Sequence, residues 1–153
     1  MQSLQERYAP NSICFGCGPK NPKGLHIRSI PKGESLVAEW TPEPHHVAFS
    51  NIASGGIMSV LFDCHGNWTA AYFLMKSRKL DSLPGTVTAE YTVRFLKPTP
   101  VDLTWRFKAW PTKVDGYKLF VEGEVEAGGL KTATMSGLFV AVKEGHPAYH
   151  RWK

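Results

Sequence analysis

The chain has 153 residues and a mass of 17.0 kDa, which is the size of about one domain. Hydrophobic residues make up 42% of the sequence, enough for a packed core, so the composition excludes a disordered chain. The formal net charge of +5 is compatible with a nucleic acid partner, an anionic small molecule or solubility alone. No apolar run reaches the roughly 18–20 residues that span a bilayer, and residues 1–11 lack the apolar stretch of a secretory signal.

Two further features of the composition indicate in which compartment the protein resides and which partners it lacks. Three cysteines are too few, and an odd number, for a disulfide scaffold, so we expect a reducing compartment and a cytoplasmic protein without a membrane partner. The Lys and Arg residues are scattered among acidic residues, with no basic run and no aromatic platform. We therefore expect no nucleic acid partner.

The start of the chain is predicted to be irregular. Residues 1–23 are rich in Pro, Gly and Asn, which favour turns over regular structure. Two short strands are expected over residues 25–30 and 35–41, separated by the turn signal Pro31-Lys32-Gly33.

A long helix is predicted from about Ala53 to Lys76. Apolar or mainly apolar residues recur there at the i, i+3, i+4, i+7 spacing: Ile57, Val60, Leu61, Cys64, Trp68, Ala71, Tyr72 and Met75. Further apolar residues make this helix hydrophobic on most sides, so we expect a sheet to cover it. The hydroxyl of Ser54 is expected to cap its first turn.

Four segments with two-residue alternation follow, over residues 86–95, 101–109, 117–126 and 130–142. In the first of them, the alternation puts Thr88 on one face with Glu90 and Arg94, opposite the apolar residues. Such runs are typical of antiparallel strands with one covered face.

The pattern as a whole predicts an α+β domain in which an antiparallel sheet wraps around one central helix. We place this single domain at residues 24–143, after the lead-in of residues 1–23 and before a C-terminal tail of residues 144–153.

Asp63 is the most informative single residue, because it lies inside the helix predicted to be buried. A carboxylate in a core costs several kcal/mol unless it is paired, hydrogen-bonded or beside a cavity. At 100° per residue it shares a narrow strip with small or polar residues such as Ser59 and Asn67. Asp63 is either a structural carboxylate satisfied by a neighbouring strand or subunit, or a general base or nucleophile at a pocket.

The segment Ser54-Gly55-Gly56 at the predicted helix start is a second candidate. Adjacent glycines let a ligand approach the backbone closely, and the first-turn N–H groups can polarise a carbonyl and stabilise an oxyanion. The alternative is a tight turn or close packing of the helix on the sheet.

Cys14-Phe15-Gly16-Cys17 raises the question of a metal. One CxxC pair supplies two of the four ligands of a structural zinc site, the remaining Cys64 lies in the helix, and no second pair exists. We therefore expect a structural loop, with no metal and no cofactor. His45 and His46 are interpreted as solvated loop residues, although an acid–base role near the helix start stays open.

The order of elements and three motifs resemble those of the hotdog-fold acyl-CoA thioesterases of the PaaI-like branch. The motifs are Cys14–Gly18 with Asn21–Leu25, Ser54-Gly55-Gly56 followed by Leu61-Phe62-Asp63, and Thr86–Ala89 continuing to Phe95–Pro100. The family has His-Gly-Gly at the second motif, so Ser54 departs from its pattern.

The resemblance implies roles for individual residues. Asp63 falls on the catalytic carboxylate, Gly56 on the backbone N–H that polarises the thioester carbonyl, and Thr88 on a strand hydroxyl that helps to position water or the carboxylate. We expect Ser54, Gly55, Asn67 and Arg94 to contact the substrate.

The resemblance also implies an activity and a partner. The expected reaction is hydrolysis of an acyl-CoA thioester to a free acid and CoA, in a homodimer or dimer of dimers whose active sites lie between subunits. Asp63 would activate water or attack the carbonyl directly. Two alternatives stay open: a hydratase or dehydratase acting on acyl thioesters, and a non-catalytic protein that binds an acyl ligand.

Overall fold

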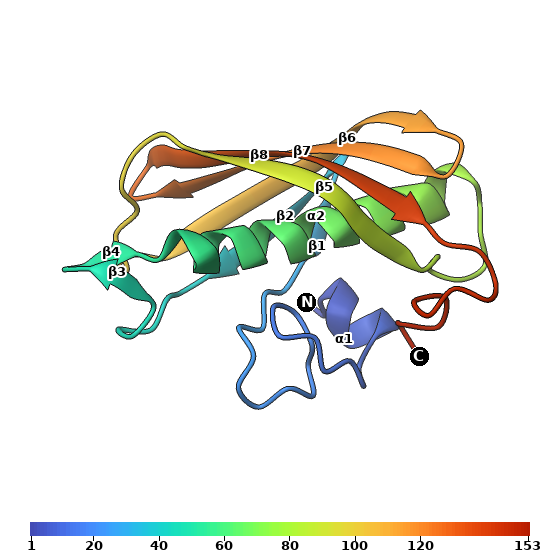
Figure 1. Ribbon diagram of the computed structural model, residues 1–153, viewed down its shortest axis with the longest axis horizontal. Helices are drawn as coiled ribbons and strands as arrows, with labels where there is room; N and C mark the ends of the chain where they lie inside the picture. The colour runs from blue at the N-terminus through green and yellow to red at the C-terminus, as the bar shows by residue number, and fades with distance from the viewer.

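A six-stranded antiparallel sheet curves over one side of a long helix in the computed structural model, which describes residues 1–153 (Figure 1). The helices are α1 (Leu4–Tyr8) and α2 (Gly55–Ser77). The strands are β1 (Ile30–Lys32), β2 (Ser35–Trp40), β3 (Val47–Phe49), β4 (Ile52–Ala53), β5 (Thr86–Phe95), β6 (Trp105–Asp115), β7 (Lys118–Ala127) and β8 (Leu130–Ala141). The large sheet has the order β1-β2-β6-β7-β8-β5, and β3 pairs with β4 separately. The predicted α+β architecture, a sheet wrapped around one helix, is confirmed.

Helix α2 lies close to its predicted bounds and is buried on most sides, because structure covers it from both directions. The concave face of the sheet covers one side, while the lead-in and the C-terminal segment cover the other (Figure 1). Phe62 packs edge-on against Phe107 of β6, with ring centroids 5.2 Å apart. Gly66 lets the helix approach the sheet, since a Cβ there would lie 2.7 Å from atoms of both Met135 and Phe139.

The lead-in contains a helix where the sequence predicted irregular structure. Ser3 and Glu6 form a capping box at the start of α1, in which the Ser3 hydroxyl accepts from the Glu6 N–H and the Glu6 carboxylate accepts from the Ser3 N–H. Gln5 is fully buried and donates to the Ser29 hydroxyl at 3.0 Å. These contacts fix α1 against the body of the protein.

The strand predicted over residues 25–30 is wrong except for its last residue. The N–H groups of Leu25 and Ile27 bond to the carbonyls of Phe15 and Gly16 in the lead-in, at 2.7 and 3.0 Å. His26 lies between them with a positive φ of 58°, which interrupts an extended strand.

The other differences concern short or extended strands. The hairpin of β3 and β4 was not predicted, because its strands have only 3 and 2 residues. Strand β6 begins at Trp105 rather than at Val101 and continues through Pro111. Pairing of β6 with β2 ends at Ala109, so the missing N–H of Pro111 faces no strand on that side.

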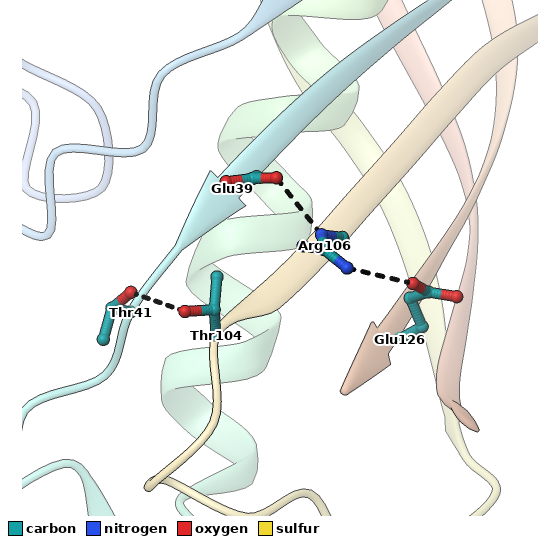
Figure 2. Close-up of polar contacts among 5 residues, drawn as sticks. All are labelled: Glu39, Thr41, Thr104, Arg106 and Glu126. Atoms are coloured by element: carbon teal, nitrogen blue, oxygen red, sulfur yellow. Dashed lines mark hydrogen bonds and ion pairs between the residues drawn. The ribbon is translucent and has the colours of Figure 1, made fainter. Parts of the chain in front are cut away.

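The outer face of the sheet is polar and exposed, as the alternation predicts (Figure 2). Arg106 of β6 lies between Glu39 and Glu126 on the neighbouring strands, 3.1 Å from one carboxylate and 3.9 Å from the other. Thr41 and Thr104 hydrogen-bond at 3.0 Å beside them. Exposed ion pairs of this kind stabilise a fold by less than about 1 kcal/mol each, so the concave face carries most of the stability.

A β-bulge in β5 overturns the predicted facing of that strand. Thr88 pairs with Phe139 and Glu90 with Leu138, which leaves Ala89 as an extra residue. Before the bulge, Thr88 faces α2; after it, the helix-facing residues are the aromatic and apolar ones, such as Tyr91. Glu90 and Arg94 therefore lie on the outer face, not on the face of Thr88 as predicted, because one inserted residue reverses the alternation.

The two edges of the sheet differ in length. Strand β1 has three residues, one of them Pro31, whereas β5 has ten and pairs only with β8. The backbone groups along the other side of β5 have no strand partner.

Neither helix combines the length and apolarity that crossing a lipid bilayer requires.

Candidate active site

Asp63 and Thr88 meet where α2 lies against the beginning of β5. The Thr88 hydroxyl donates to the Asp63 carboxylate, with 2.5 Å between the oxygens. The bulge at Ala89 is what turns Thr88 toward the helix at this point. Asp63 is partly buried, so it keeps access to solvent or to a bound molecule.

The environment of Asp63 makes its carboxylate more basic than usual. Burial is the main cause that raises its pKa, and the negative charge of a Cys14 thiolate acts in the same direction. The Thr88 hydroxyl and the Arg151 guanidinium oppose this shift without cancelling it. A partly buried carboxylate with a raised pKa is suited to taking a proton from water.

Two further residues at this position were missed by the sequence reasoning. Tyr91 lies on the helix-facing side of β5, and burial followed by the charge of Asp63 raises the pKa of its phenol. Arg151, in the predicted tail, donates to the Thr86 carbonyl at 2.7 Å. The local sequence pattern does not indicate that either residue is near Asp63. Tyr91 is brought there by the bulge in β5, and Arg151 by the path of the C-terminal segment.

The start of α2 leaves its first N–H groups free for a ligand. Ser54 occupies the N-cap position with an extended backbone, but its hydroxyl makes no capping hydrogen bond, so the predicted side-chain cap is wrong. A Cβ on Gly55 would lie 3.2 Å from the Phe95 ring, so this glycine allows close packing. A Cβ on Gly56 would meet only the Ser54 hydroxyl, at 3.5 Å, which makes Gly56 the open position.

A mainly apolar cavity of about 430 Å³ opens beside this helix start. Its lining comes from β3, β4, the beginning of α2, the end of β5 and the turn that follows it, and includes Phe49, Ile52, Met58, Phe95 and Lys97. Asp63 does not line it. The chain thus carries an apolar cavity near the helix N-terminus and a basic carboxylate further along the same helix.

The spacing of Gly56 and Asp63 separates these two groups. Seven residues of α-helix span about 10 Å along the axis and turn through nearly two full rotations, so both residues point in about the same direction. A carbonyl bound by the Gly56 N–H is therefore out of reach of Asp63 in the same chain.

Comparisons with solved structures identify the architecture. A thioesterase superfamily protein from Shewanella loihica superposes over 76% of this chain and 91% of its own, with 26% identity and a TM-score of 0.64. The E. coli PaaI protein of the phenylacetic acid degradation operon covers 78% of this chain and 81% of its own, with 16% identity and a TM-score of 0.66. The chain has the hotdog fold.

The predicted resemblance to hotdog-fold thioesterases is thereby confirmed. A phenylacetic acid degradation-related protein from Ralstonia eutropha has the same hotdog architecture, with 18% identity, a TM-score of 0.63, and coverage of 76% and 86% of the two chains. No family model and no curated protein sequence matches the chain.

The fold places two further predicted substrate contacts, Asn67 and Arg94, in different surroundings. Asn67, one turn further along α2, is buried and donates to the Thr86 carbonyl at 3.2 Å, while its Oδ1 has no partner. Arg94 is exposed on the outer face of β5. Their contact with a substrate stays a prediction.

His46 is less solvated than predicted. Its ring is buried, stacks on Trp40 at 5.2 Å and accepts from the Glu43 N–H at 2.9 Å. Its carbonyl accepts from the Ser54 N–H, so it holds the helix start through the backbone. His45 is exposed.

The hotdog helix also brings the third cysteine to the CxxC pair. The sulfur atoms of Cys14, Cys17 and Cys64 all lie within 4.8 Å of one another. Hydrogen bonds from the Cys17 and Cys64 thiols lower the pKa of Cys14, and the same contacts raise the pKa of Cys17 and Cys64. The sequence spacing gave no indication of this cluster.

Proposed function

We propose that the protein is an acyl-CoA thioesterase that works as a dimer. The observation that carries this proposal is the pair formed by Asp63 and Thr88, a basic carboxylate held by a hydroxyl at an unpaired sheet edge. The free N–H of Gly56 at the helix start would supply the second element that thioester chemistry needs, which is stabilisation of an oxyanion.

The dimer in this proposal pairs β5 with β5 of a second copy. Two-fold symmetry makes such a pair antiparallel, so the Thr88 end of one strand lies beside the Phe95 end of the other. Within each chain, Thr88 contacts Asp63 and Phe95 packs on Gly55 at the helix start. The Asp63 of one chain then lies close to the Gly56 of its partner, which closes the gap of about 10 Å along α2.

The proposed chemistry divides the work between the two chains. The Gly56 N–H donates to the thioester carbonyl oxygen, which gains negative charge as the carbon is attacked. Asp63 either removes a proton from the attacking water or attacks the carbon itself and forms an anhydride that water then cleaves. In both routes the CoA thiolate leaves, and the apolar cavity beside Phe49, Met58 and Phe95 accommodates the apolar part of the substrate.

The test is hydrolysis of a panel of acyl-CoA thioesters by Asp63→Asn. Loss of the carboxylate removes the base or nucleophile but keeps the shape and an acceptor for Thr88. We expect turnover to fall by about 10²–10⁴-fold while the circular dichroism spectrum is unchanged.

Asp115→Asn is the matched control, because it makes the same change in an exposed hairpin and should leave turnover unaltered. Hydrolysis at the wild-type rate by Asp63→Asn would overturn the proposal. Hydration of enoyl-CoA without hydrolysis, or tight binding of acyl-CoA without turnover, would replace it with a hydratase or a binding protein.

A further inference from the structure

The cysteine cluster joins two distant parts of the chain at one point. Cys14 and Cys17 belong to the lead-in, Cys64 belongs to α2, and Cys14 and Cys64 are 50 residues apart in sequence. These are all the cysteines of the chain, and all three are free thiols. No step of the proposed thioesterase chemistry uses these sulfur atoms, although the negative charge of Cys14 adds to the raised pKa of Asp63.

The distances between the sulfur atoms suit a shared metal ion. With Zn–S bonds of about 2.3 Å, two thiolates of a tetrahedral site lie about 3.8 Å apart. The sulfur atoms of Cys14 and Cys64 are 3.7 Å apart, and the Cys17 sulfur lies within 4.8 Å of both. The Cys14–Cys64 separation matches one edge of a tetrahedral site, and the Cys17 sulfur would move inward by at most about 1 Å to complete a face.

The loop is built to bring its sulfurs onto the helix. A Cβ on Gly16 would lie 2.3 Å from the Cys64 sulfur, and a Cβ on Gly18 would lie 2.4 Å from the Cys14 backbone nitrogen. Neither position accepts a side chain without moving the loop. The two glycines of the motif therefore allow the cluster to form.

One neighbouring donor supports negative charge on a sulfur, and a second holds the backbone of the loop. The Trp68 indole N–H donates to the Cys17 sulfur at 3.3 Å, and Arg28 donates to the Cys17 carbonyl at 3.2 Å. Donors around thiolate ligands orient them and tune the metal. Cys17 and Cys64 are only 2% and 8% exposed, whereas Cys14 is partly exposed and leaves a path for an ion.

We propose that Cys14, Cys17 and Cys64 bind one thiophilic metal ion, Zn²⁺ or Cu⁺, through three thiolates. Soft thiolate ligands select these ions over Mg²⁺ and Ca²⁺. Binding releases to solvent the protons of those thiols that are still protonated, and it leaves an outward coordination position on Zn²⁺. The ion clamps the lead-in onto α2 at the residue after Asp63, so it is a structural site beside the candidate catalytic carboxylate.

The direct test measures metal in the reduced wild-type protein. We expect one Zn²⁺ or one Cu⁺ per chain by mass spectrometry, and the two ions are then distinguished by separate reconstitution of the chelator-treated protein. Co²⁺ serves as a probe, because three thiolate ligands produce a thiolate-to-cobalt charge-transfer absorption. This signal reports on the folded wild-type chain whether or not any variant folds.

The variants are Cys14→Ser, Cys17→Ser and Cys64→Ser, with Phe15→Ala as the control in the same loop. Each serine variant should bind Zn²⁺ at least about 100-fold more weakly, since loss of a supporting group alone costs 10–100-fold. Phe15 is exposed, so its variant should bind as the wild type does. Absence of the charge-transfer absorption and of Cu⁺ binding in the reduced wild type would overturn the proposal, as would metal that persists in all three serine variants.

Discussion

The hydroxyl of Thr88 influences the pKa of the Asp63 carboxyl group. A hydrogen bond to a charged acceptor contributes about 1.5–3 kcal/mol, and here it lowers the pKa of a carboxylate that burial raises. In Thr88→Val we expect the acid limb of the pH–rate profile to move to higher pH and kcat to fall by about 10-fold or more. Steady-state hydrolysis across pH measures both effects.

Two further variants isolate the role of the hydroxyl. Thr88→Ser retains the donor and should restore most of the rate. Thr92→Val makes the same change on the outer face of β5, since Thr92 pairs with the exposed Ser136. Equal losses in Thr88→Val and Thr92→Val would assign the effect to the strand rather than to Asp63.

His65 links folding to pH because it is fully buried in its neutral form. Its Nε2 donates to the Leu36 carbonyl at 3.0 Å, and its Nδ1 accepts from the Ser29 hydroxyl at 2.8 Å. Burial lowers the pKa of His65 from 6.5 to about 4. The unfolded chain therefore binds a proton at a pH where the folded chain does not.

The contribution of His65 to stability is complete above pH 6.5 and is lost as the pH falls to about 4. The loss amounts to about 3 kcal/mol of unfolding free energy. Urea denaturation of wild type and His65→Gln over this range measures it, because the variant lacks the titrating ring. Parallel stability curves for the two proteins would contradict the assignment.

Single residues were predictable where their chemistry conflicts with the local pattern. Asp63 stands out because a carboxylate interrupts an apolar helix. The facing of Thr88 was not predictable, since a bulge is set by pairing with β8 and leaves no mark in the alternation. The same holds for Cys64, whose approach to Cys14 depends on how the lead-in folds back.

At the scale of one helix, Gly56 and Gly66 serve different purposes. Gly66→Ala places a methyl group against Met135 and Phe139, and we expect it to destabilise the fold by about 1–3 kcal/mol. Gly56→Ala makes only an ordinary contact with the Ser54 hydroxyl and should change stability by less than about 1 kcal/mol. Its turnover should nevertheless fall, because the methyl group narrows the approach to the first-turn N–H.

Urea denaturation and acyl-CoA hydrolysis by the two glycine variants separate packing from substrate approach. A Gly56→Ala protein that is fully active would exclude close approach of substrate at this residue. A Gly66→Ala protein of unchanged stability would show that the helix can move away from the sheet.

Elements were predictable in proportion to their length. Helix α2 and the four long strands follow from periodicity, because each repeats its pattern many times. Helix α1 has only five residues in a region rich in Pro and Gly, although Ser3 and Glu6 carry a readable capping signature. Residues 25–30 have a strand-like composition, but the N–H groups of Leu25 and Ile27 bond to the lead-in, and only Ile30 joins the sheet.

At the scale of the molecule, the proposed division of one site between two chains allows complementation. Asp63→Asn and Gly56→Leu should each be inactive alone. Mixed, unfolded and refolded together in equal amounts, they should recover about a quarter of wild-type activity, since half of the dimers are mixed and each has one intact site. Recovery of no activity, with mixed dimers detected by mass spectrometry, would place both groups in one chain's site.

The edge formed by β5 has a consequence for handling and evolution of the protein. The unpaired side of this ten-residue strand is a template for any extended chain, and natural sheets shield such edges by charge, bulges, proline or shortness, as β1 does with Pro31. β5 has the bulge at Ala89 and the exposed charges of Glu90 and Arg94, but it also carries exposed Tyr91 and Phe95. If β5 pairs with β5 of a second copy as proposed, a substitution that weakens this pairing should leave the edge open and favour aggregates over stable monomers. Solubility and the proposed activity would then constrain the same strand.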